Sequence, residues 1–149
     1  MSAWLSLMVP GTRGGDVYDL VHRLLPDDVY GINLNPGHLI AYEEWISSPI
    51  AAGSDDELRS GMVFQIDVIP SHPVYGSTRM EEGIVLADAS LRAELAASHP
   101  GVLRRCDARR AFMRDTLGYD VPDTVLPLAD VAGMVTPFLL SPRLVVTLA

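Results

Sequence analysis

The 149 residues fit one domain, 1–149, and a composition of 48% hydrophobic and 20% charged residues excludes an intrinsically disordered chain. Eleven basic and nineteen acidic residues give a net charge of −8, which excludes nucleic acid as a general partner because phosphate repels an acidic surface. A lone cysteine, and an apolar run at the amino end that is too short to cross a membrane, predict a cytoplasmic protein with no membrane association.

The first predicted helix lies between a turn and a proline. Residues 10–15 combine proline and glycine in a turn, and Asp16 is the residue expected to cap the helix that follows. The helix is expected to run to about Leu25, since apolar side chains recur at helical spacing and Pro26 stops it.

Two extended segments are expected next, at 29–34 and 38–42, with the turn Asn35-Pro36-Gly37 between them. Residues 47–57 are rich in small and acidic side chains and predict a surface loop. His38 therefore begins the second extended segment directly after a turn.

The clearest strand is expected at 62–69, and a second strand at 78–87 forms an antiparallel pair with it. Each carries an acid in its middle, since Asp67 lies between apolar neighbours and Glu81 interrupts the second run. A carboxylate in a core strand costs free energy unless a cation or several hydrogen-bond donors meet it. Acids brought together in this way require protonation, an arginine or a metal, and two carboxylates with one imidazole suit Mn, Fe, Co or Zn.

The last third predicts two helices followed by irregular chain. One helix is expected at 89–98, stopped by Pro100-Gly101, and another at about 102–117, ended by Gly118. A last strand is expected at 143–149. The apolar stripe of the second helix consists of Val102, Cys106, Met113 and Leu117.

The second of these helices is also rich in arginine. Its basic residues are Arg104, Arg105, Arg109, Arg110 and Arg114. We interpret them as a solvated helix face that pairs with nearby acids such as Asp107 and Asp115, and a docking patch is the alternative.

Four segments carry short motifs, and the order of these motifs along the chain is informative. They are V-P-G-T-R-G-G-D-V-Y at 9–18, N-P-G-H-L-I followed by E-E-W at 35–45, S-G-M-V-F-Q-I-D-V-I-P at 60–70, and G-S-T-R-M-E-E-G-I-V-L at 76–86. In this order they resemble the carboxy-terminal half of the pita-bread metallopeptidases, the superfamily of methionine aminopeptidases, prolidases and creatinases. The third segment is similar to the family's G-M-V-F-T-I-E-P strand, and the fourth to its partner, G-x-R-I-E-D-T-V-L-V.

The resemblance implies an α/β (α+β) fold that forms half of a pita bread, with a curved, mostly antiparallel sheet and helices on its outer face. It implies that His38 is the imidazole ligand of a divalent metal, which would be Mn, Co, Fe or Zn. Asp67 stands where the family has a glutamate ligand, and Glu81 matches the bridging glutamate.

The sequence also departs from the family. The two aspartate ligands and the second histidine of the family have no counterpart, and Ala41 and Tyr42 occupy the neighbourhood of that histidine. Asp67 is one methylene shorter than the family's glutamate. The missing ligands are therefore expected from a second subunit of a homo-oligomer, or from a separately encoded amino-terminal half, with an interface over residues 62–86.

Three functions remain open on these observations. The first is a metal-dependent peptidase of the Xaa-Pro dipeptidase or aminopeptidase type, incomplete or inactive as an isolated chain. The second is a non-catalytic interaction module or pseudoenzyme that retains the fold. The third is a creatinase-like protein that binds a small amino-containing ligand without a metal. For single residues, His38 could be a turn residue held by its own loop, and Asp67 and Glu81 could pair with Arg79.

Overall fold

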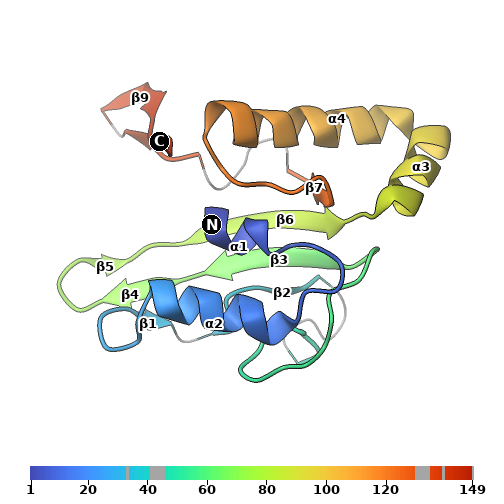
Figure 1. The fold of residues 1–149 in the computed structure, drawn as a ribbon. Coiled ribbons are helices and arrows are strands. Elements are labelled where there is room, and N and C mark those ends of the chain that lie inside the picture. The colour runs from blue at the N-terminus through green and yellow to red at the C-terminus, as the bar shows by residue number, and fades with distance from the viewer. Residues whose placement is uncertain (33, 41–45, 130–134, 139, 149) are drawn as a thin grey trace.

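The computed structural model describes residues 1–32, 34–40, 46–129, 135–138 and 140–148. The elements in chain order are α1 (Ser2–Ser6), α2 (Gly14–Leu24), β1 (Gly31–Ile32), β2 (His38–Leu39), β3 (Val63–Val68), β4 (Pro70–His72), β5 (Gly76–Ser77), β6 (Met80–Leu86), α3 (Ala89–Ser98), α4 (Pro100–Ala111), the π-helical turn η1 (Phe112–Thr116), β7 (Val125–Pro127), β8 (Pro137–Phe138) and β9 (Ser141–Val145). Helices are thus combined with antiparallel sheets, which confirms the predicted α/β fold class (Figure 1).

The central sheet has four strands in the order β2-β3-β6-β7, and every neighbouring pair is antiparallel. Its longest ladder joins β3 and β6, with Val63 opposite Val85 at one end and Val68 opposite Met80 at the other. The antiparallel pair predicted for 62–69 and 78–87 is therefore confirmed. Beyond this ladder, β4 pairs with β1 on one side and with β5 on the other in a second sheet, while β8 and β9 form a separate hairpin.

One face of the central sheet forms the core. Along β6 and the first four residues of β3 the buried side chains alternate with less buried ones, as the pleat of a strand with one covered face requires, while Asp67 in β3 is buried on the other face. Figure 1 shows α1 and α2 in front of this sheet, and their apolar side chains belong to the same cluster. The buried members of the cluster are Trp4, Leu5, Met8, Val17, Val21, Ile50, Leu58, Phe64, Ile66, Val68, Ile84, Leu86, Met113, Leu117, Val121 and Val125.

Helix α2 begins at Gly14, two residues before the predicted cap, so Asp16 lies in the first turn and does not cap it. The reason is a backbone contact with a distant loop. The N–H groups of Gly14 and Gly15 donate to the carbonyls of Asp56 and Ser54 at 2.9 and 3.1 Å. These bonds satisfy the free N–H groups of the first turn, a role that a side-chain cap would otherwise fill. Residues 47–57 form an irregular loop as predicted, although Ile50 within it is fully buried.

The two extended segments are shorter than predicted, and each pairs with another part of the chain. Strand β1 pairs with β4, and β2 pairs with β3 at the edge of the central sheet. Residues 33, 41 and 42 of the predicted segments lie outside the described residues.

The helix predicted at 89–98 is confirmed as α3, which has these same bounds. The helix begins there because the Asp88 side chain caps it by accepting from the Leu91 N–H at 2.9 Å. Pro100, however, begins α4, since proline suits the first helical position, where its missing N–H costs nothing. Val102 is 49% exposed although the rest of the predicted stripe is buried.

The two ends of the chain also differ from the predictions. The last strand is β9, which begins and ends earlier than the predicted 143–149 and pairs with β8. The amino end forms α1, which the sequence did not predict. Among the described residues, no helix is both long and apolar enough to span a bilayer.

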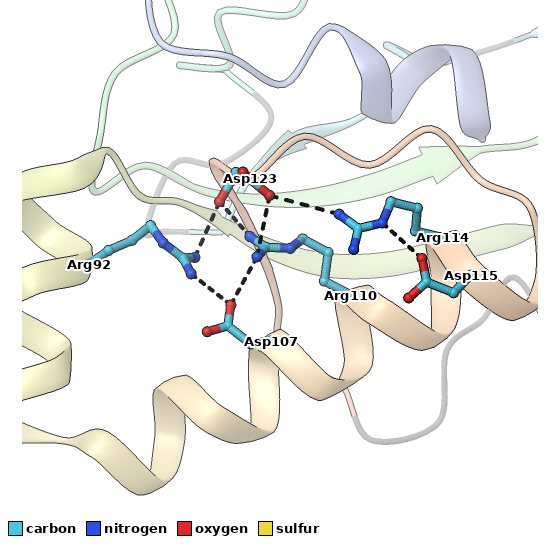
Figure 2. Close-up of polar contacts among 6 residues, drawn as sticks. All are labelled: Arg92, Asp107, Arg110, Arg114, Asp115 and Asp123. Atoms are coloured by element: carbon cyan, nitrogen blue, oxygen red, sulfur yellow. Dashed lines mark hydrogen bonds and ion pairs between the residues drawn. The ribbon is translucent and has the colours of Figure 1, made fainter.

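Three arginines, one each from α3, α4 and η1, join these elements to the turn before β7 in an ion cluster made of the six residues drawn in Figure 2. Asp107 Oδ1 accepts from Arg92 at 2.8 Å and lies 3.2 Å from Arg110. Arg110 also lies 3.4 Å from the carboxylate of Asp123, and both arginines donate to the Asp123 carbonyl. Arg114 pairs with Asp115 at 3.0 Å. Arg110 and Arg114 therefore pair with nearby acids as predicted, whereas Arg105 donates to the Leu128 carbonyl and Arg109 lies over the Phe112 ring.

Replacing Arg110 by alanine is expected to lower the free energy of unfolding by about 1–3 kcal/mol, because the mostly buried Arg110 side chain is lost together with its bonds to the partly buried Asp107 carboxylate and the Asp123 carbonyl. Urea unfolding measures the change. Arg104→Ala, an exposed position on the same helix, is the control and should change stability by less than about 0.5 kcal/mol. Equal effects of the two substitutions would show that the cluster contributes nothing.

Candidate functional site

The predicted site residues lie on the face of the central sheet opposite the core. His38 is paired with Gln65, and Asp67 is paired with Glu81. Directly paired residues share a face, and residues two apart in one strand share it as well. The strand register therefore places His38, Gln65, Asp67 and Glu81 together, whereas Phe64 and its alternating neighbours point into the core. The neighbouring acid Glu82 is paired with Ile66 and faces the core, where it is 2% exposed.

Asp67 is the centre of this arrangement. It is 8% exposed, and within the described part of the chain its Oδ1 atom is buried without a hydrogen-bond donor. Burial raises the pKa of its carboxyl group above the ordinary value, and the negative charge of Glu81 raises this pKa further. His38 and Arg79 act in the opposite direction and lower it. A carboxylate in this setting is costly when ionised, and a cation would relieve the cost.

His38 presents one particular ring nitrogen to Asp67. Its Nδ1 lies 2.9 Å from the carbonyl oxygen of Leu39, and because a carbonyl only accepts, Nδ1 must carry the proton. In the neutral ring the lone pair is then on Nε2, which lies 3.8 Å from Asp67 Oδ2. A backbone contact that fixes the tautomer in this way is typical of histidines that ligate metals. The same contact also fits the simpler prediction that the local backbone holds His38.

Glu81 stands apart from the other two residues. Its backbone lies directly opposite Asp67, but its side chain is exposed. Across the part of the chain that the structure describes, no three His, Cys, Asp or Glu side chains are grouped closely enough to hold a metal ion. The structure thus brings His38 and Asp67 together and leaves Glu81 beside them on the same face.

The donor types of this pair fit a divalent metal. Imidazole nitrogen and carboxylate oxygen lie about 2.0–2.2 Å from ions such as zinc, so two ligands of one tetrahedral ion are about 3.4 Å apart. The 3.8 Å between His38 Nε2 and Asp67 Oδ2 is slightly longer than this spacing. The unpartnered Oδ1 of Asp67 adds an acceptor that nothing in the described chain satisfies. His38 and Asp67 therefore fit as part of a ligand set.

The sequence did not single out Trp4, which contacts the turn before His38. Its indole Nε1 donates to the Pro36 carbonyl at 2.6 Å across 32 positions of the sequence. The turn at 35–37 could be predicted from its proline and glycine, but no periodicity or motif signals a partner in α1.

Comparison with known proteins adds little to this geometry. No protein-family model matches the chain, and no curated protein matches it. Among solved structures, the chain is similar to a dipeptidase from Pyrococcus horikoshii OT3, with 21% sequence identity and a TM-score of 0.44. The match covers 56% of this chain and 24% of the dipeptidase, so the chain spans about a quarter of that protein's length.

Proposed function

We propose that this chain forms part of a metal-dependent peptidase site of the Xaa-Pro dipeptidase or aminopeptidase type. The observation that carries the proposal is the buried Asp67 carboxylate, whose Oδ1 has no donor in the described chain and whose Oδ2 lies 3.8 Å from Nε2 of His38. Two such groups, on one face of an antiparallel sheet beside a further carboxylate, form an oxygen and nitrogen ligand set for Mn, Co, Fe or Zn.

In this proposal each residue has a defined task. His38 and Asp67 hold the ion, and Glu81 swings from its exposed position to complete the group. A bound divalent ion would supply Lewis-acid chemistry, polarising a peptide carbonyl and lowering the pKa of a water molecule. The remaining ligands come from another polypeptide, either a second copy of this chain or a separately encoded amino-terminal half. The chain on its own is then expected to bind metal weakly and to be inactive.

A second candidate is a metal-free site for a small amino-containing ligand. It is supported by the exposure of Glu81 and by the lack of a complete three-ligand group among the described residues. An ammonium group donates up to three hydrogen bonds and could meet the free acceptors of Asp67 and Glu81 without a metal.

Titration with Mn²⁺ and Co²⁺ tests the proposal, together with the metal content and oligomeric mass of protein purified without chelator. We expect wild-type protein to bind a cation and Glu81→Gln to lose at least about tenfold in affinity, as the removal of a ligand requires. Glu94→Gln is the matched control, because Glu94 is an exposed glutamate on α3 away from the site.

The outcomes separate the two candidates. Cation binding that weakens in Glu81→Gln but not in Glu94→Gln supports the metal site. If the wild-type protein is a stable, metal-free monomer that binds neither Mn²⁺ nor Co²⁺, the metal site is excluded. Binding of a primary amine by that same monomer would favour the second candidate.

A further inference from the structure

Strand β2, which carries His38, is held weakly by its own ladder. It has two residues and lies at the edge of the central sheet, where β3 alone among the described strands pairs with it. The next residue, Ile40, donates one more hydrogen bond, to the Val63 carbonyl at 2.9 Å. Each such bond contributes about 1 kcal/mol, so a ladder this short leaves the entry into the strand poorly defined. Some other contact must set where the chain turns into β2.

That contact comes from Trp4 in α1. The indole is 1% exposed, and its N–H donates to Pro36 O at 2.6 Å, two residues before His38. The ring also covers Gly37, where an added Cβ would lie 2.9 Å from Trp4 Cζ2 and 3.1 Å from Gln65 O. The backbone of Gly37 is therefore enclosed between the indole on one side and β3 on the other. Its φ of 119° is one that residues with a side chain rarely adopt.

We infer that Trp4 is a positioning residue for His38, acting through the turn 35–37 from the core side of the sheet. The indole N–H fixes Pro36 and the indole ring fixes Gly37, so the backbone enters β2 at one place. The imidazole at the next position is then held with its Nε2 3.8 Å from Asp67 Oδ2. This role rests on the proposed function in so far as it concerns cation binding, but the position of His38 can be measured without any cation.

The Trp4→Phe variant tests the inference, because it keeps an aromatic ring in the core and removes the N–H that binds Pro36. Without added cation, we expect amide exchange at Gly37 and Ile40 to accelerate at least about tenfold, since a lost hydrogen bond of about 1.4 kcal/mol corresponds to that factor. The imidazole ¹⁵N resonances of His38 should shift at the same time. With Mn²⁺, affinity should fall about 10–100-fold, as when the support of a metal ligand is removed.

Leu126→Val is the matched control for a general loss of packing. Leu126 is 3% exposed in a separate core cluster with Ala87 and Cys106, and the shorter side chain lowers stability by about 1 kcal/mol. It should leave the Gly37 and Ile40 exchange rates and the His38 resonances unchanged. If Trp4→Phe does not fold, 3-benzothienylalanine introduced at position 4 alone keeps the indole shape and lacks the N–H.

The outcomes separate the positioning role of Trp4 from the proposed function. Faster exchange and a shifted His38 imidazole in the Trp4 variant, but not in Leu126→Val, support it. Exchange and resonances that match wild type, or that change equally in the control, overturn it. Wild-type protein that binds no Mn²⁺ refutes the proposed function instead, while the cation-free measurements still decide the positioning role.

Discussion

Replacing Gly14 by alanine is expected to destabilise the protein by about 3–5 kcal/mol, a large share of the roughly 5–15 kcal/mol that stabilises a typical domain. An added Cβ at this position would overlap the carbonyl carbon and oxygen of Pro49 and would lie 3.0 Å from the backbone nitrogen of Ile50. These are backbone atoms next to a fully buried side chain, so they cannot move aside as the end of a flexible side chain could. The first turn of α2 would separate from the loop that satisfies its N–H groups.

Urea unfolding of Gly14→Ala beside Gly31→Ala tests this expectation. At Gly31 an added Cβ meets nothing within 4 Å and the φ angle is ordinary, so alanine there should change stability by less than about 1 kcal/mol. The two variants differ only in what surrounds the new methyl group. A Gly14→Ala protein as stable as Gly31→Ala would mean that the loop does not pack against α2 as described.

The two long strands of the central sheet could be predicted because burial has a period of two along β6 and the first four residues of β3. Helix α3 could be predicted because its cap, Asp88, is local. Helix α1 could not, since it has five residues and no side-chain cap. A helix this short has little stability of its own and forms because Trp4 and Leu5 pack into a core made by distant strands. The start of α2 was misplaced for the same reason, because its N–H groups bond to a loop about forty residues away.

The candidate site divides in a similar way. Asp67 and Glu81 could be found from the sequence because each interrupts an apolar strand, and pairing the two strands brings them face to face. The prediction of His38 as a ligand depended on the resemblance to a family. Its position on the same face as Asp67 follows from a two-residue ladder, which hydrophobic periodicity does not reveal. The exposure of Glu81 and the contact of Trp4 with Pro36 depend on tertiary packing, for which the sequence carries no local signal.

Asp67→Asn is expected to change stability and cation binding in opposite directions. In wild-type protein with a chelator present, the pKa of Asp67 in the folded state is raised above its ordinary value of 3.8. Folding therefore favours the protonated carboxyl. This favourable contribution is complete below the unfolded-state pKa and is lost as the pH rises through the folded-state pKa. Asparagine cannot ionise, so the variant should unfold at a higher temperature than wild type at neutral pH, and the difference should vanish in acid.

Added Mn²⁺ should reverse the order of stability at neutral pH. A cation that binds only the folded protein stabilises wild type in proportion to the logarithm of its concentration, whereas the variant lacks the carboxylate and should lose at least about 100-fold in affinity. Asp28→Asn, at an exposed position, should follow wild type under both conditions. An Asp67→Asn variant less stable than wild type in chelator would mean that the buried carboxylate stabilises the fold by itself. The burial of Asp67 would then need no cation to account for it, and the main support for a metal site would be gone.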